Sequence, residues 1–328
     1  MNYTSRIAGI LAGGAVLLAA EVAEAATYTF STIDFPGGSR NTAFGINDAG
    51  QIVGNYVDGS TFTFHGFLYD HGSFRNIDVP GAGFTQAFGI NDAGQIVGAY
   101  FARSGGGEHG FVYDAGNFNT LDVPGAGSTT AQSINNAGEI VLNDGSGHAF
   151  LYAAGVFSPI SVPGAFTTEA FGINDAGQIV GNYVDSNGGH GFLDSAGAFS
   201  PIDVNGTFTS ALGINNNSQI VGGYRESTSD HGFLDSNGII TTIDVPGAAP
   251  PPEFLTPSLG ELGTSAYGIN NAGQIVGIYS DGTGLHSTHG FLATPAGIPE
   301  PASFTLLGSG LLGLGLLVLS VGRARTSD

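Results

Sequence analysis

Short apolar runs, each bounded by glycine-rich polar turns, recur along most of the chain. In one stretch the runs cover Ala43 to Asn47, Gln51 to Tyr56, His65 to Tyr69 and Phe74 to Val79, and they are rich in Phe, Ile and Val. Runs of this length and composition predict β-strands, and apolar residues at helical spacing are absent from them. The Asn-Asp-Ala-Gly segment at 47–50 predicts a hairpin turn, because Asn and Asp cap turns and Gly takes a positive φ. The pattern predicts a unit of four short strands.

Three sequence anchors repeat this unit along the chain, and each anchor occurs six times. A Gly-Ile-Asn-like anchor begins at Gly45, Gly89, Ser133, Gly172, Gly213 and Gly268. A His-Gly-Phe or His-Ala-Phe anchor begins at His65, His109, His148, His190, His231 and His289. The third anchor, Asp-Val-Pro-Gly in its fullest form, begins at Asp34, Asp78, Asp122, Ser161, Asp203 and Asp244. Successive Gly-Ile-Asn anchors lie 44, 44, 39, 41 and 55 residues apart.

Repeat length and the order of the anchors together predict the fold. Four strands in about 42 residues is the size of a propeller blade, whereas a solenoid coil is usually about half as long. Tyr28 to Pro36 matches the fourth strand of a unit that has no preceding strands, and the repeats end at His289 to Leu292, a third strand without its fourth. We therefore predict an all-β fold, a six-bladed β-propeller over 26–294. Pairing of its N- and C-terminal strands, Tyr28 to Asp34 beside His289 to Leu292, would close the ring and remove an exposed sheet edge.

The first 25 residues are predicted to be a signal peptide. Arg6 precedes an apolar stretch from Ile7 to Ala20, and Ala23-Glu24-Ala25 has the small-x-small pattern of a signal peptidase site. The alternative is an N-terminal membrane anchor. The acidic residues Glu21 and Glu24 shorten the apolar run below the roughly 20 residues that a membrane span needs.

The C-terminal region has a different organisation. Residues 295–303 form a linker that contains Pro299, Glu300 and Pro301, and 304–322 is an uncharged apolar stretch long enough for one transmembrane helix. The basic tail at 323–328, with Arg323 and Arg325, is placed in the cytoplasm by the positive-inside rule. This order of features resembles the PEP-CTERM sorting signal of Gram-negative bacteria. The resemblance implies an inner-membrane intermediate, cleavage by an exosortase-type membrane protease, and release to the cell surface or the exopolysaccharide matrix. Before processing, the membrane would be contacted only through this helix. The alternative is a simple single-pass anchor.

The repeat units also resemble the HAF extracellular repeats, in which a His-Ala-Phe triplet recurs. His148-Ala149-Phe150 matches the triplet, and the other five units carry Gly in its middle position. This resemblance implies an exported bacterial protein and no particular activity.

Composition excludes several classes of partner. Between residues 26 and 297 there are 23 Asp and Glu residues, no Lys and four basic residues, which are Arg40, Arg75, Arg103 and Arg225, so the net charge is about −19. The electrostatic field of this negative charge repels nucleic acids and anionic lipid headgroups. The chain has no Cys, so disulfides and thiolate metal sites are excluded.

The recurring histidines are the first candidates for chemistry. Six of the eight occupy the same place in successive units, namely His65, His109, His148, His190, His231 and His289. A ligand or a general base is normally needed once, so a residue present in every unit is expected to be structural. We predict that each imidazole is buried and hydrogen-bonded within its blade or to a neighbour. On that basis His109→Ala would cost roughly 1–3 kcal/mol, with similar costs at His65 or His190.

Other candidate sites are weaker. Asp48, Asp92 and Asp175 lie in turns that lack the alternating oxygen ligands of a calcium loop. We therefore predict no cofactor, and only weak accumulation of Ca²⁺ through the overall charge. No nucleophile elbow, Walker loop or dinucleotide fingerprint occurs.

Residues that break the repeat are better candidates for function. They are Arg103, Glu108, Glu169, Arg225, Glu226 and the insertion at 248–264. The alternative, which we favour for the five charged residues, is that they are variable surface residues without a functional role. Glu169 or Glu226 could meet another acid across the channel, as the two carboxylates of a glycosidase do.

Together these features favour a non-enzymatic binding or scaffold propeller at the cell surface or in the matrix. Its expected partner is extracellular polysaccharide or another envelope component, bound through the propeller face. The alternatives are an extracellular glycan hydrolase or lyase, and an ice-binding surface protein. A cluster of carboxylates and Arg at the channel mouth would favour the enzyme. A channel ringed by equivalent residues from every blade would favour binding.

Overall fold

The computed structural model describes residues 27–205, 208–227, 229–249, 263–284 and 287–297. The predicted signal peptide, the sorting residues Pro299, Glu300, Pro301, Arg323 and Arg325, and the predicted helix at 304–322 lie outside these residues, as does most of the insertion at 248–264. Within the described part of the chain no helix is long and apolar enough to cross a membrane.

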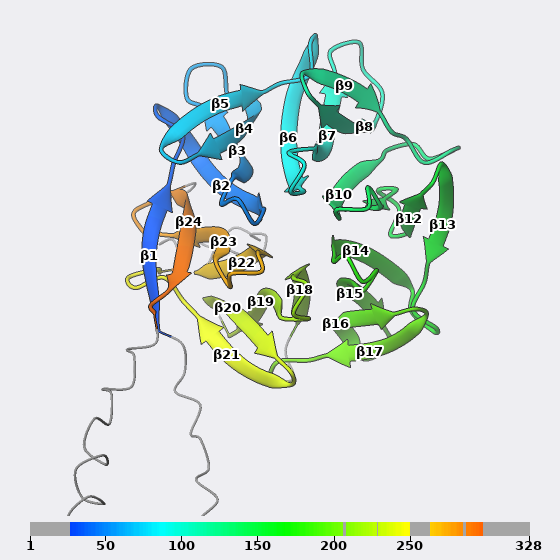
Figure 1. Cartoon of the computed structure of the whole chain (residues 1–328), viewed down its shortest axis with the longest axis vertical. Helices are drawn as coiled ribbons and strands as arrows, with labels where there is room; N and C mark the ends of the chain where they lie inside the picture. The colour runs from blue at the N-terminus through cyan, green and yellow to red at the C-terminus, as the bar shows by residue number, and fades with distance from the viewer. Residues whose placement is uncertain (1–26, 206–207, 228, 250–262, 285–286, 298–328) are drawn as a thin grey trace, which may run out of the picture.

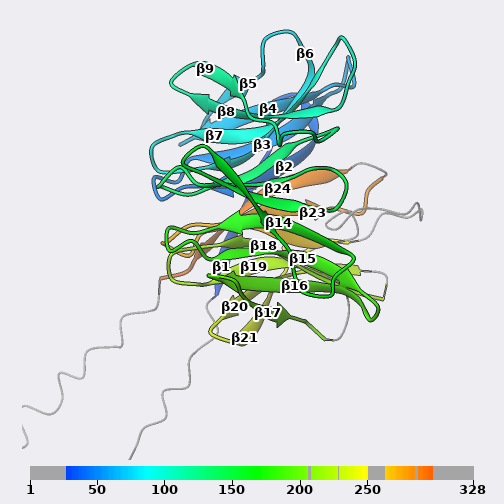
Figure 2. The ribbon, with the colours of Figure 1, turned by 90° about the vertical axis from the view of Figure 1, so that its right-hand side faces the viewer.

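Six four-stranded antiparallel sheets are arranged around a central axis, so the predicted six-bladed β-propeller is confirmed (Figure 1). In the view turned by 90° the sheets form a disc, with blades 2 and 5 at opposite ends (Figure 2). In blades 1 to 5 the four strands follow one another in sequence from the channel to the outer edge.

Each blade has one strand at the channel, two in the middle and one at the outer edge. In this order, blade 1 consists of β2 (Gly38–Ile46), β3 (Ile52–Asp58), β4 (Phe64–Asp70) and β5 (Ser73–Ile77). Blade 2 consists of β6 (Ala82–Ile90), β7 (Ile96–Ala102), β8 (Glu108–Asp114) and β9 (Asn117–Thr120). Blade 3 consists of β10 (Thr130–Ile134), β11 (Ile140–Asn143), β12 (Ala149–Ala153) and β13 (Val156–Ile160). Blade 4 consists of β14 (Thr167–Ile173), β15 (Ile179–Asp185), β16 (Gly188–Ser195) and β17 (Ala198–Ile202). Blade 5 consists of β18 (Thr209–Ile214), β19 (Ile220–Glu226), β20 (Ser229–Ser236) and β21 (Ile239–Ile243). Blade 6 consists of β22 (Thr264–Ile269), β23 (Ile275–Ser280), β24 (Thr288–Pro295) and β1 (Tyr28–Ile33).

Blade 6 is assembled from both ends of the described chain. The N-terminal strand β1 pairs antiparallel with β24, from Tyr28 opposite Pro295 to Ile33 opposite Gly290. The pairing continues one step further, where the backbone N–H of Ala296 donates to the carbonyl oxygen of Thr27 at 2.7 Å. The predicted closure of the ring is therefore confirmed (Figure 1).

All four predicted strands of blade 1 are present, and their boundaries agree with the structure within two residues except at the start of the first strand. The first strand begins at Gly38, five residues earlier than expected, because the chain is already extended as it leaves the turn before it. Gly38 lies flat against the ring of Tyr56, where an added Cβ would come within 2.7 Å of the ring. The fourth strand ends at Ile77, since Asp78 and Val79 belong to the turn that leads into blade 2.

A glycine and a phenylalanine fill the centre of five blades. In blade 2 a Cβ on Gly98 would lie 2.0 Å from the carbonyl oxygen of Gln86 and 2.8 Å from the ring of Phe111, so only Gly leaves room for the buried ring. Blade 3 has Leu142 at the glycine position, and this side chain is fully buried. Its phenylalanine, Phe150, is only partly buried. The leucine thus fills volume that the aromatic ring occupies elsewhere, which keeps the core close-packed.

Candidate functional site

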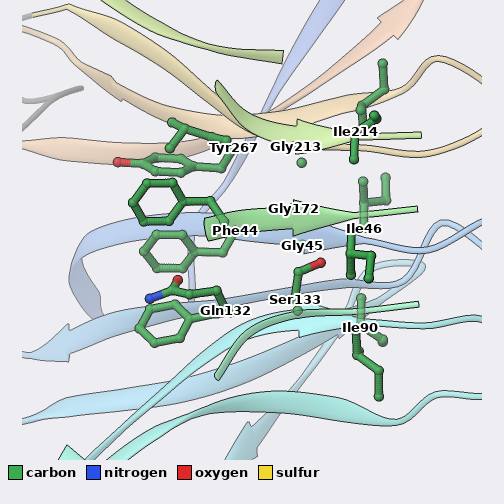
Figure 3. A pocket seen from close by; sticks show the side chains of 18 residues that line it. Phe44, Gly45, Ile46, Ile90, Gln132, Ser133, Gly172, Gly213, Ile214 and Tyr267 are labelled. Carbon is green, nitrogen blue, oxygen red and sulfur yellow. The ribbon is translucent and has the colours of Figure 1, made fainter. Parts of the chain in front are cut away.

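The inner strand of every blade has a β-bulge at the same place. The strand register shifts between Ala43 and Gly45 in β2, and at the equivalent positions of β6, β10, β14, β18 and β22. A bulge re-aims the side chain of the extra residue, and here that side chain lines the central channel (Figure 3). The six bulged residues are Phe44, Phe88, Gln132, Phe171, Leu212 and Tyr267.

The next residue along each inner strand lets neighbouring blades approach closely. A Cβ on Gly45 would lie 2.8 Å from the carbonyl oxygen of Phe88 and 3.2 Å from the Cα of Gly89. Five blades carry Gly at this position, and blade 3 carries Ser133. Tight contact between the inner strands keeps the channel narrow.

The channel is built in layers that follow the sequence of the inner strand. The bulged residues form one layer, the Gly or Ser residues the next, and six isoleucines the third (Figure 3). A cavity of about 230 Å³ lies on the side of the bulged residues, and a smaller one of about 70 Å³ lies on the other side. The isoleucines line both cavities, and they are Ile46, Ile90, Ile134, Ile173, Ile214 and Ile269.

The asparagines that follow the isoleucines form a closed ring of hydrogen bonds. The Nδ2 of Asn47 donates to the carbonyl oxygen of Asn91 at 3.1 Å, and Asn91 donates in the same way to Asn135 at 3.2 Å. The series continues around the channel until Asn270 donates to the carbonyl oxygen of Asn47 at 3.1 Å. All six side chains are buried. The motif is a turn, as predicted, but it also joins each blade to the next, which was not foreseen.

A second ring of hydrogen bonds surrounds the mouth of the channel, one residue further along. The backbone N–H of Asp48 donates to Oδ1 of Asp92 at 2.8 Å. Each further member donates in the same way to the next, and the ring closes from Asn271 to Asp48; the other members are Asp92, Asn136, Asp175 and Asn216. Burial raises the pKa of Asp175, but the hydrogen bonds from Asn136 and Asn216 outweigh it, so the pKa lies below its usual value. Among the described residues no group of three or more His, Cys, Asp or Glu side chains is arranged to hold a metal ion.

The recurring histidines lie at the far end of the strands from the two rings. His109 Nδ1 is hydrogen-bonded to Asp122 Oδ2 at 2.8 Å, and the Gly110 N–H donates to the other oxygen of this carboxylate at 3.2 Å. The imidazole also stacks on Tyr100, with ring centroids 5.3 Å apart. His65, His190, His231 and His289 have the same kind of aspartate partner and the same stacked tyrosine. The aspartate thus ties the third strand to the segment that follows the fourth strand.

Blade 3 departs from this arrangement. Ser161 replaces the aspartate, and His148 is hydrogen-bonded instead to Asp144 at 2.8 Å, with 66% of its side chain exposed. The expected burial is wrong in the other blades too, since 22–35% of the side chain of each of these histidines is exposed. The histidines lie at the end of the strands, where solvent reaches the imidazole and the carboxylate. Their structural role remains a prediction.

We expect His109→Ala to reduce the free energy of unfolding by about 0.5–1.5 kcal/mol, the net worth of one partly exposed hydrogen bond. This is less than a buried pair would lose, because Asp122 is 40% exposed and can be hydrated. His148→Ala is the matched control and should change stability by less than about 0.5 kcal/mol. Urea denaturation of the two variants measures both values. Equal losses at the two positions would contradict the role assigned to the aspartate.

Two histidine pairs should make stability depend on pH. The Asp203 hydrogen bond and charge, with Asp185, raise the pKa of His190 against the opposing effect of burial. Burial lowers the pKa of His289, but the hydrogen bonds and charges of Asp34 and Asp281 outweigh it, so the pKa is raised. Since the folded protein holds these protons more tightly than the unfolded chain, the contribution is complete below about pH 6.5, the ordinary His value, and is lost as the pH rises through the raised pKa.

The variant with both His190→Gln and His289→Gln should therefore lose less stability than the parent protein between about pH 6.5 and pH 8.5. Urea denaturation across this range measures the slope. Asn119→Ala is the control, because Asn119 is exposed and does not titrate. This variant should show the same dependence of stability on pH as the parent protein. A double variant with the parent slope would show that these pairs do not control the pH dependence.

The residues that break the repeat do not gather at the channel. Arg103 Nε donates to the carbonyl oxygen of Ala82 at 3.0 Å. Arg225 forms a double hydrogen bond with the buried carboxylate of Asp230, at 2.7 and 3.2 Å. Burial alone raises the pKa of Glu108 and of Glu169. The described residues that line the channel cavities include none of these four, nor Glu226, so the structure places no Glu169 or Glu226 pair across the channel.

The sequence matches no family model and none of the curated proteins compared with it. Among solved structures, it is similar to virginiamycin B lyase from Staphylococcus aureus, with 9% identity, a TM-score of 0.46, and 82% of this chain and 100% of that chain covered. It is also similar to the β-propeller domain of the Trilobed protease from Pyrococcus furiosus, with 9% identity, a TM-score of 0.49, and 79% and 94% covered. The luciferin-regenerating enzyme gives 10% identity, a TM-score of 0.49, and 83% and 96% covered. At this distance the likenesses concern the propeller fold and carry no information about activity.

Proposed function

We propose that this protein is an exported, non-catalytic propeller of the cell surface or the exopolysaccharide matrix, and that it binds extracellular polysaccharide. Export is inferred from the predicted signal peptide at 1–25 and from the resemblance of the last 31 residues to a PEP-CTERM signal. The acidic composition, with no Lys and a net charge of −20, is compatible with a neutral partner and unfavourable for nucleic acid.

The observation that carries the non-catalytic role is the composition of the channel wall. The larger cavity is lined by equivalent residues from all six blades, and no Asp, Glu, Lys, Arg or His occurs among the described residues that line it. Glycan hydrolysis commonly needs two carboxylates on either side of the bond that is cleaved. The carboxylates of the smaller cavity, Asp48, Asp92 and Asp175, each accept hydrogen bonds from neighbours in the ring.

A pull-down with exopolysaccharide from the native host tests binding. Protein purified from the extracellular fraction should be retained on the immobilised polymer and released by an excess of the soluble polymer. Bovine serum albumin, another acidic protein, serves as the control for charge. Failure to retain the protein above this control would refute the proposed function.

Processing is tested separately by intact-mass measurement of the extracellular protein. We expect a chain that begins near Ala26 and lacks residues 304–322, because signal peptidase and an exosortase-type protease would remove both ends. Retention of 304–322 would mean that the C-terminal segment is a simple anchor.

A further inference from the structure

The larger channel cavity has one polar side. Five blades contribute Phe, Tyr or Leu to the layer of bulged residues and Gly to the next layer. Blade 3 contributes Gln132 and Ser133 at these two positions (Figure 3). These adjacent residues are therefore the place where the repeat is broken inside the channel itself.

The side chains of Gln132 and Ser133 have polar atoms that are available to bind a ligand. Gln132 Nε2 donates to Thr130 Oγ1 at 3.1 Å, which fixes the side-chain amide. Its Oε1 accepts no hydrogen bond from a described residue, and the same holds for the Ser133 hydroxyl. An acceptor and a hydroxyl are thus presented side by side on the wall of the cavity.

Aromatic rings line the cavity from the blade opposite this polar side round to the blade next to it. Tyr267, Phe44 and Phe88 belong to three consecutive blades, 6, 1 and 2, and their rings are in edge contact, with centroids 4.9 Å and 5.1 Å apart. Blade 6 is opposite blade 3 in the six-membered ring (Figure 1). Tyr267 and Gln132 hold the equivalent bulged position of these two blades, so they lie on opposite walls of the cavity. Pockets of this kind, mainly apolar with a few polar groups, select a ligand by its shape and orient it by its hydrogen bonds.

The size of the cavity and its lack of charge limit the ligand further. A volume of about 230 Å³ is smaller than most sites for drug-sized molecules, which are roughly 300–1,000 Å³. The six isoleucines lie between this cavity and the smaller one of about 70 Å³, so we expect the end of a chain to enter rather than a continuous chain to pass through the channel. A carboxylate would be buried in this cavity without a cation, which is strongly unfavourable.

We infer that this cavity binds the terminal pyranose ring of a neutral polysaccharide, with the apolar face of the sugar against Tyr267, Phe44 and Phe88 and its hydroxyl groups on Gln132 and Ser133. The inference rests on the proposed function and specifies its site. The sequence itself suggests the substitutions that test these residues. Gln132→Phe and Ser133→Gly introduce the residues that other blades carry at the equivalent positions. Phe44→Leu likewise introduces the residue of blade 5.

Titration calorimetry with neutral tetrasaccharides of glucose, galactose and mannose, and with tetragalacturonate, tests the inference on the extracellular protein. We expect at least one neutral tetrasaccharide to bind and tetragalacturonate not to bind. The double change Gln132→Phe and Ser133→Gly should weaken binding at least about tenfold, and Phe44→Leu about threefold or more. Ser158→Ala, on the exposed outer strand of blade 3, should leave affinity unchanged, and all variants should keep the parent unfolding midpoint.

Three outcomes would overturn the inference. They are unchanged affinity in the double variant, binding of tetragalacturonate alone, and retention on exopolysaccharide without binding of any neutral tetrasaccharide. In each of these cases the protein would still bind polysaccharide, but at another surface or through another kind of sugar. Loss of exopolysaccharide retention in the parent protein would instead refute the proposed function.

Discussion

A chain that begins at Gly37, and so lacks β1, is expected to lose at least about 5 kcal/mol of stability, enough to unfold many domains of this kind. β1 supplies six residues of antiparallel pairing to β24. Ile33 is 4% exposed, and Tyr28 and Phe30 pack against the core of blade 6. Burial of Ile33 contributes about 1.5–3 kcal/mol, and the partly buried Tyr28 and Phe30 contribute less each. Asp34, which accepts hydrogen bonds from His289 and from the Gly290 N–H, would also be lost.

Deletion of β1 also creates an unpaired edge strand, since β24 would have no neighbour on its outer side. Urea denaturation and size-exclusion chromatography should therefore show an unfolded or self-associated chain. The matched control is a permuted chain in which residues 27–36 follow residue 297 through a short turn. This control should fold, because Thr27 and Ala296 are hydrogen-bonded neighbours. A monomeric deletion variant of parent stability would contradict the closure of the ring.

Asn91→Ala is expected to reduce the free energy of unfolding by about 3 kcal/mol, at least twice the loss expected for His109→Ala. The buried amide donates to Gln95 Oε1 at 2.9 Å and to the carbonyl oxygen of Asn135 at 3.2 Å, and it accepts from the Gln95 N–H at 3.0 Å. Alanine would leave these partners unsatisfied in a buried site, at about 1–3 kcal/mol each before any relaxation.

Urea denaturation measures this loss, with the exposed Asn119→Ala of the same blade as the control that should change stability by less than about 0.5 kcal/mol. Asn174→Ala and Asn270→Ala should cost about as much as Asn91→Ala, because the ring provides each with the same partners. A loss below about 0.5 kcal/mol at all three positions would show that the ring contributes little to holding the blades together.

The fold was predictable from the sequence because its main determinant is repetition. The spacing of the anchors indicated the number of blades, and the unmatched strand motif at each end predicted the β1–β24 pairing. Pairings within a hairpin depend on local turn residues such as Asn47 and Gly50, so they too could be inferred from one unit.

The channel could not be predicted in the same way, because it depends on contacts between blades. The bulge that turns Phe44 towards the axis has no signature within a single repeat. The asparagine ring does have one, since every unit carries Asn followed four residues later by Gln or Glu, from Asn47 and Gln51 to Asn270 and Gln274. A turn needs no such pairing, so its sixfold recurrence pointed to a further role. The burial of the histidines was misjudged because recurrence indicates a structural position without indicating its depth.

Gln132 and Ser133 were not identified as candidate site residues from the sequence, because they are uncharged. Gln132 and Ser133 break the repeat inside its own anchor, whereas the charged residues that break it elsewhere, such as Arg103 and Glu226, lie outside the channel lining. Where a repeat motif forms the wall of a cavity, an uncharged residue that departs from the motif can therefore mark a binding site.

The most direct test of a binding rather than a catalytic role follows the polymer itself. Exopolysaccharide from the native host is incubated with a stoichiometric amount of the extracellular protein, and its chain length and content of reducing and unsaturated ends are measured over a day, alongside the amount of protein bound. We expect the protein to remain bound while chain length and end content stay at the values of the protein-free sample. A progressive shortening of the chains, with new reducing or unsaturated ends, would contradict this account and identify the propeller as a hydrolase or a lyase.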